Sequence, residues 1–131
     1  MNIETFDHLL QAARAQPRSQ RLLFVFAAAE PPDQPTPAQQ AAFEAGQGGA
    51  LVPVMCVDKA PADLQNFDAL VAEASTFGGA WQIVFAAAID GRDSAAAQAP
   101  LAGMEAAIRA GRVQSYLPFD RNGRAVQLLA G

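Results

Sequence analysis

The chain is poor in the residues that usually build metal and redox sites. Its 131 residues include one cysteine, Cys56, and one histidine, His8. A single cysteine excludes an internal disulfide and a zinc site made of several cysteines. No neighbouring residue in the sequence is placed to lower the pKa of Cys56, so we expect a small buried side chain and not a nucleophile. The sequence therefore predicts no metal, no cofactor and no catalytic residues.

Basic residues and long apolar runs are also scarce. Nine Lys and Arg are outnumbered by thirteen Asp and Glu, which gives a net charge of -4. A domain that binds the phosphate backbone normally carries a basic face, so no nucleic acid partner is expected. No apolar run reaches the ~20 residues that span a bilayer, and the N-terminal residues lack the apolar centre of a signal peptide. We expect a cytoplasmic protein that does not bind membranes.

The composition that remains is globular, with 51% hydrophobic and 17% charged residues. The length fits one domain over residues 1–131 with a sizeable core. Within it, two apolar runs that end in an acid are nearly identical, Phe24 to Glu30 and Ile83 to Asp90. Both alternating sets of side chains in each run are apolar, so the strands 21–29 and 81–89 should be central and covered on both faces.

The segments around these strands predict a three-layer α/β domain with helices on both faces of the sheet. Helical spacing, caps and glycine stops predict four helices, at residues 1–16, 36–46, 61–78 and 101–110. Further strands are expected at residues 50–58, 115–121 and 124–129.

Proline and turn residues predict the order of the strands. Pro53 and Pro118 each remove a ladder donor, which places strands 50–58 and 115–121 towards the outside. Asn122-Gly123 predicts a two-residue hairpin that sets Phe119 opposite Val126. The expected order in a sheet of about five strands is 50–58, 21–29, 81–89, 115–121, 124–129. Helical connections permit parallel crossovers, but the relative direction of the two central strands stays open.

The two halves of the chain resemble each other. Phe6-Asp7 matches Phe67-Asp68, and Val25 to Ala29 matches Val84 to Ala88. Three further matches follow in the same order, so we predict an internal αβαβ duplication with repeats of about 1–60 and 61–131. The alternative is that alanine-rich α/β sequences match by chance.

Polar residues at the strand ends form the candidate ligand site. Ligands of open α/β sheets bind at the carboxyl ends of strands, and those ends carry Glu30, Asp58, Lys59, Asp90 and Arg92. Their carboxylates could do acid/base work, and the two cations could bind a small anion. The alternative is that strands end at the surface, where charges are common. If the strands of the two halves run in opposite directions, their charged ends would lie at opposite ends of the sheet and would not form one site.

Four motifs carry a resemblance that extends over nearly the whole chain, at residues 6–14, 21–29, 48–59 and 117–121. They resemble a group of short betaproteobacterial proteins labelled "ribonucleotide reductase subunit alpha". Large subunits of that enzyme are several times longer and need a radical cysteine with a redox pair, which one cysteine does not supply. The resemblance therefore implies a small stand-alone bacterial protein, and no catalytic residue is carried over.

These observations favour a non-enzymatic binding or interaction module that forms a homodimer or binds another protein. The alternative is a small-molecule-binding protein or an enzyme with a polar site at the strand ends. An exposed apolar patch of a few hundred Å² would favour the first reading. A concave pocket where three of the strand-end residues converge would favour the second.

Overall fold

The computed structural model describes residues 3–30, 34, 36–44, 50–76, 80–91 and 93–126. The elements follow one another as α1 (Phe6–Arg14), β1 (Gln20–Glu30), α2 (Pro37–Glu44), β2 (Ala50–Lys59), η1 (Pro61–Asp63), α3 (Phe67–Ser75), β3 (Ile83–Asp90), η2 (Ser94–Ala97), α4 (Gln98–Arg109) and β4 (Leu117–Phe119). The α/β class and the predicted alternation of helices and strands are confirmed. No helix within these ranges is long and apolar enough to cross a membrane.

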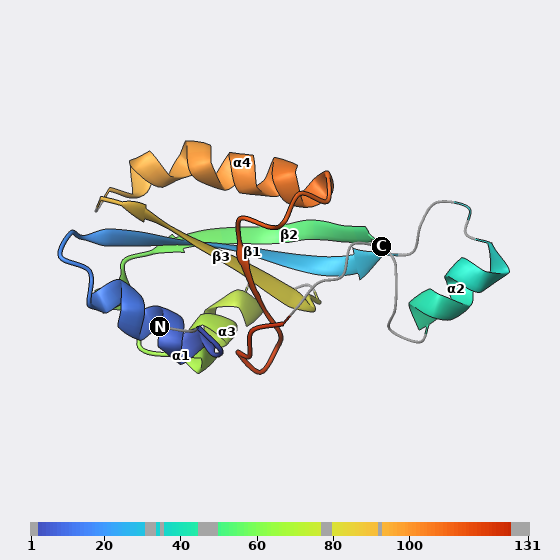
Figure 1. The fold of residues 1–131 in the computed structure, drawn as a ribbon, viewed down its shortest axis with the longest axis horizontal. Coiled ribbons are helices and arrows are strands. Elements are labelled where there is room, and N and C mark those ends of the chain that lie inside the picture. Colours follow the sequence, from blue (N-terminus) through green and yellow to red (C-terminus); the bar gives the residue numbers. More distant parts are fainter. Residues whose placement is uncertain are drawn as a thin grey trace.

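The four strands form one sheet in the order β2-β1-β3-β4, and every neighbouring pair is antiparallel (Figure 1). The predicted order of these strands is confirmed, with the proline-containing β2 and β4 outside the two central strands. The open question of direction is answered, because β1 and β3 run in opposite directions. None of the helical connections between these neighbours is a parallel crossover.

A first core lies between the sheet and the pair α1 and α3, which cover one face (Figure 1). It is rich in rings: Phe6 packs with its centroid 5.0 to 5.5 Å from those of Phe24, Phe67 and Phe119. Thr5 caps α1 and Asn66 caps α3 by accepting a backbone N–H in the first turn. The Arg14 guanidinium donates to the carbonyls of Pro61 and Leu64, which fixes the end of α1 against η1.

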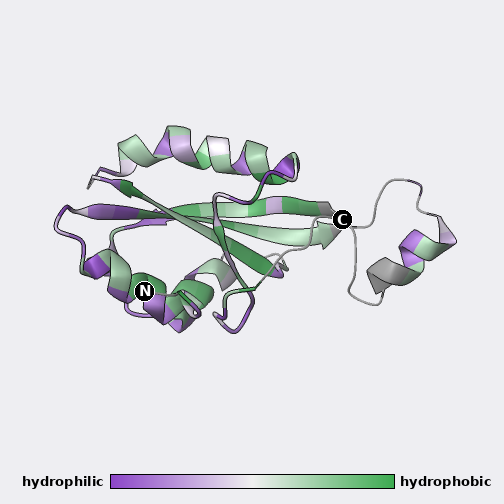
Figure 2. Ribbon diagram, viewed as in Figure 1, coloured by the Kyte–Doolittle hydropathy of each residue, from purple (hydrophilic) through white to green (hydrophobic). Residues whose placement is uncertain are grey.

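A second core lies between the opposite face of the sheet and α4. Leu101, Met104 and Ile108 recur at helical spacing and are buried against β1 and Phe85 of β3. This core holds aliphatic side chains and alanines, with Phe85 its one fully buried ring. Figure 2 shows that hydrophobic residues follow the strands while hydrophilic residues gather in the loops. Helices therefore cover both faces, as predicted.

The helix α2 packs on neither face of the sheet. Figure 1 shows it beyond the end of the β1–β2 pair, and Ala38, Gln39 and Ala41 are exposed. The sequence predicted a helix here, which is confirmed, but its eight residues carry little amphipathic pattern to hold it on the core.

Two predicted segments differ from the structure. The helix predicted at 61–78 begins at Phe67, because Asn66 is the cap and Pro61–Asp63 form a separate 3-10 turn. Residues 90–100, where neither a helix nor a further strand was predicted, contain η2 and the first turn of α4. The Asp93 carboxylate accepts a hydrogen bond from the Ala95 N–H and caps η2, and the alanine-rich sequence after it continues into α4.

The predicted two-residue hairpin at Asn122-Gly123 is wrong. The loop has three residues, Arg121 to Gly123, because Asp120 N–H donates to the Arg124 carbonyl at 2.9 Å. Gly123 takes φ +78°, as a type I turn followed by a left-handed residue requires. Phe119 therefore pairs with Ala125 and not with Val126. The rest of the predicted fifth strand, 127–129, lies outside the described residues.

The duplication stays a prediction. Both halves follow the order helix, strand, helix, strand, and Phe6 and Phe67 lie in the same core. The matched strand residues, however, point to opposite faces: Val25 packs in the α4 core and Val84 in the α1 and α3 core. A two-fold axis between neighbouring antiparallel strands is perpendicular to the sheet and keeps each residue on its face. The strand match would therefore need a shift of one residue.

Candidate functional site

The strand-end charges do not meet at one rim. Glu30 pairs with Ala50 at one end of the sheet, whereas Asp58 pairs with Leu23 and Asp90 with Gln20 at the other. Ten residues of β1 separate these ends, a span of about 33 Å. A site between Glu30 and Asp90 is therefore not possible. Arg92 lies outside the described residues.

Asp58 is held by two donors. Its Oδ2 accepts from Arg21 Nε at 2.6 Å and from Ser94 Oγ at 2.7 Å. The side chains of Arg21 and Asp58 are only 16% and 12% exposed. Burial raises the pKa of the Asp58 carboxyl, but the hydrogen bonds from Ser94 and Arg21 and the positive charge of Arg21 outweigh it and lower the pKa. Asp58 is thus a charged structural link between β1, β2 and η2.

Lys59 and Asp90 also have partners within the chain. Lys59 Nζ lies 2.6 Å from Glu73 of α3, on the face opposite to Asp58 and its partner Ser94. Asp90 accepts from Gln20 at 2.6 Å and lies 3.8 Å from Arg18, in an exposed position. The structure thus brings Asp58, Lys59 and Asp90 to one end of the sheet, but it divides the first two between the faces. Ligand binding by these residues stays a prediction.

Cys56 is exposed on β2, so the expectation of a buried side chain is wrong. It pairs with Val25 in the ladder, on the α4 face, and its Sγ lies 3.0 Å from Glu105 Oε1. Partial burial of the sulfur, the hydrogen bond to Glu105 and the charges of Glu105 and Asp58 raise the pKa of the Cys56 thiol to about 11. The thiol stays protonated at neutral pH, which argues against a nucleophile.

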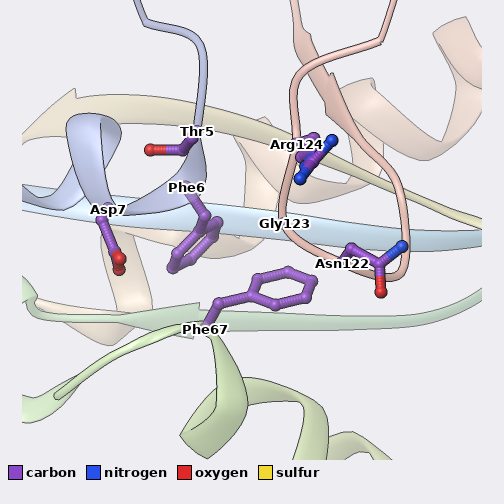
Figure 3. A pocket seen from close by; sticks show the side chains of 7 residues that line it. All are labelled: Thr5, Phe6, Asp7, Phe67, Asn122, Gly123 and Arg124. Carbon is purple, nitrogen blue, oxygen red and sulfur yellow. The ribbon is translucent and has the colours of Figure 1, made fainter.

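Two shallow depressions lie where α1, α3 and the turn after β4 converge, and Figure 3 shows the first of them. The first encloses about 150 Å³ above the rings of Phe6 and Phe67, with Asn122 and Arg124 at its margin. The second, of about 230 Å³, shares Phe67 and Asn122 and adds Asp68. Ligand pockets usually hold ~300–1,000 Å³, and these two are smaller and open. None of the strand-end residues lines either depression.

Trp81 and His8 make contacts within the fold. Trp81 is buried, with the Arg121 guanidinium 4.6 Å over its ring and donating to its carbonyl at 2.7 Å. Trp81 therefore packs as part of the core beside α1 and α3. His8 Nδ1 accepts the Glu4 N–H at 3.2 Å, a local bond at the start of α1. Among the described residues, no group of three His, Cys, Asp or Glu is arranged to hold a metal ion.

The outer edge of β2 is the surface that the site prediction missed. Within the described ranges β2 (ten residues) pairs only with β1, so its N–H and C=O groups that point away from β1 have no partner strand. Its sequence from Ala50 to Val57 carries no charge, and Val54 at the centre is 47% exposed, the one exposed large hydrophobic side chain described. The opposite edge is different: Ala125 bridges Phe119 of β4, and Arg124 bridges Thr5.

Two signals in the sequence could have identified this edge. Pro53 predicted an outer strand, and the charge-free run beside it is unusual in a surface strand, because edge strands normally carry charges that block pairing. Compared with known proteins, the chain matches no family model, no curated protein and no solved structure. The resemblance to short betaproteobacterial proteins therefore stays an expectation, and the function has to be argued from the geometry.

Proposed function

We propose that the protein is a non-enzymatic interaction module that forms a homodimer through the outer edge of β2. The observation that carries this proposal is the exposed Val54 at the centre of a charge-free, unpaired edge strand. Unpaired backbone groups on such an edge accept another strand, and the usual protection by charged side chains is missing from Ala50 to Val57.

The shape of the edge favours a dimer of limited size. The ladder shifts between Phe26 and Ala27, so that Val54 forms a bulge between Met55 and Pro53. A bulge and a proline both shorten the stretch that can pair. On the other side of the sheet, Ala125 bridges β4 and Arg124 bridges Thr5, and in the described residues only the short end of β3, Ala87 to Asp90, continues past β4 without a partner strand. A single long open edge among the described strands supports a closed two-fold dimer over an open array.

The two halves of the chain supply a second part of the proposal. We infer that they descend from one αβαβ unit, supported by the shared order of elements and by the common core of Phe6 and Phe67. In that case β2 is the counterpart of β4. Residues 124–126 cover the outer edge of β4, whereas no described segment covers the outer edge of β2.

The substitution Val54→Lys tests the homodimer. A lysine on each copy places two like charges in a surface that must lose water, so we expect dissociation into monomers. The measurement is sedimentation equilibrium from micromolar to hundreds of micromolar protein. The matched control is Ala72→Lys on the exposed side of α3, which adds the same charge away from the edge and should leave the dimer intact. A monomeric wild type, or a V54K protein that dimerises as the wild type does, contradicts the proposal.

A further inference from the structure

The position of α4 extends the β2 edge into a wider surface. Of the four strands, β2 is the one that α4 contacts most, followed by β1, so this helix lies over the outer pair of strands. Figure 1 shows it running along β2 on one side of the sheet. The Cys56 thiol donates a hydrogen bond to Glu105 Oε1 of α4, with an Sγ–O distance of 3.0 Å. The side of α4 that carries Glu105 therefore faces β2 and its open edge.

Helical spacing defines this flank of α4. Leu101, Met104 and Ile108 point into the core. The flank beside them, which includes Glu105, repeats at i, i+4, i+7 and i+11 and consists of Gln98, Ala102, Glu105 and Arg109. Gln98, Ala102 and Arg109 are exposed and Glu105 is half-exposed. The flank combines a small residue with one negative and one positive charge.

A second copy paired at the β2 edge would bring two such flanks together. An α4 centred over the β1–β2 pair lies half a strand spacing inside β2. The distance between the two helices is then about two strand spacings, or ~10 Å. That value falls at the usual ~8–10 Å separation of packed helices. The small side chain of Ala102 allows this approach.

Resting on the proposed dimer, we infer that α4 packs antiparallel against α4 of the second copy, with Glu105 of each chain paired to Arg109 of the other. This pairing places the two-fold axis at residue 107 of α4. Glu105 is level with Cys56, and two residues along a helix advance about 3 Å, close to one residue of a strand. The axis therefore passes β2 near Met55, because α4 and β2 run in opposite senses: the contact on β2 moves back from Asp58, at Ser94 before α4, to Cys56, at Glu105 within α4.

The charges are complementary in this arrangement. With the axis near Met55, Asp58 lies opposite Val52 and Lys59 opposite Leu51 of the other chain, so no like charges oppose each other across the strands. Arg109 forms no hydrogen bond or ion pair with the described residues, and Glu105 uses one carboxylate oxygen for Cys56. Because Pro53 and the bulge shorten strand pairing, the helix contact supplies part of the interface and selects a second copy as the partner.

Charge exchange tests the helix contact. Glu105→Arg and Arg109→Glu each place like charges across the two-fold axis and should raise the dimer Kd by about tenfold or more. The double variant E105R/R109E restores opposite charges and should bring the Kd back to within about threefold of the wild type. Asp63→Arg and Arg18→Glu make the same reversals at exposed positions away from the interface, and they should leave the Kd unchanged. Circular dichroism melts verify that each variant is folded.

The outcomes separate the two proposals. If the wild type dimerises and V54K does not, but the single reversals leave the Kd unchanged, the helix contact is wrong and the edge dimer stands. The same holds if the double variant is as weak as the two single effects combined. If the wild type is a monomer, or if V54K still dimerises, the edge dimer itself is wrong. Rescue by the double variant cannot arise from a general loss of stability, so that result supports the helix contact.

Discussion

The two faces of the sheet hold the molecule together in different ways. The α1 and α3 face is an aromatic cluster in which Phe6 touches three rings, and its own N–H donates to Gly123 at 2.7 Å. Both ends of the described chain therefore meet on that face. The α4 face has one helix over aliphatic side chains and leads to the open edge of β2. The difference indicates that the first face secures the fold, whereas the second leads to the unpaired strand edge that we propose as the dimer contact.

The largest expected effect comes from truncating the aromatic face. Phe6→Ala removes a fully buried ring from the centre of the cluster and should lower the free energy of unfolding by about 4 kcal/mol. Met104→Ala removes a buried side chain from the α4 core and should cost about 3 kcal/mol. Urea unfolding at low protein concentration measures both values. A larger loss for M104A would reverse the ranking of the two faces.

Two glycines with the same backbone angle form a matched pair, Gly123 in the turn after β4 and Gly111 after α4. Gly123 and Gly111 both have φ +78°, but a Cβ at Gly123 would lie 3.1 Å from the Phe67 ring, whereas at Gly111 it would meet nothing within 4 Å. Gly111→Ala should cost about 1 kcal/mol for the left-handed backbone alone. Gly123→Ala adds the contact with the ring and should cost about 2–3 kcal/mol. Equal losses in urea unfolding would show that the turn does not press on the aromatic cluster.

On the other side of the sheet, Asp58 predicts a pH dependence. Its pKa is lower in the folded than in the unfolded protein, so its contribution is present above the unfolded pKa and is lost as pH falls through the folded pKa. Asp58→Asn should cost about 2 kcal/mol at pH 7 and progressively less as pH falls below about 4. Asp90→Asn, in an exposed pair, should change stability by less than about 0.5 kcal/mol. A D58N loss that stays constant down to pH 2 would be the contrary result.

The smallest effect concerns the thiol at the open edge. A pKa of about 11 leaves little thiolate at pH 8, so Cys56 should react with a disulfide reagent far more slowly than free cysteine, despite its exposure. Glu105→Gln removes a negative charge beside the sulfur, lowers its pKa and should speed the reaction several-fold. Stopped-flow absorbance measures the rates. A Cys56 that reacts as fast as free cysteine would mean that Glu105 does not hold the thiol.

Much of the fold could be predicted from the sequence because its signals are local. The doubly apolar strands, the prolines of the outer strands and the caps gave the class, the order of four strands and helices on both faces. The direction of β1 and β3 could not be predicted, since a run apolar on both sides fits either direction. The hairpin was misjudged because Asn122-Gly123 fits two loop lengths, and the backbone bond between Asp120 and Arg124 selects the longer one.

The candidate site was harder to predict. The prediction assumed that the charged strand ends lie at one edge of the sheet, as in a parallel sheet. In the antiparallel sheet Glu30 lies at the end opposite to Asp58 and Asp90. Arg21 and Ser94, which hold Asp58, lie 37 and 36 positions away in the sequence, so no local pattern points to them. Pro53 indicated that β2 is an outer strand, but whether another segment of the chain covers its outer edge could not be predicted from the sequence.

Hydrogen exchange at the β2 edge tests the central claim most directly. Amide exchange is measured by mass spectrometry at several protein concentrations across the dimer Kd. The edge dimer predicts that peptides covering Val52 to Val57 become more protected as concentration rises, while those covering α1 and α3 do not change. Exchange in β2 that is independent of concentration, in a protein shown to dimerise, would contradict the account.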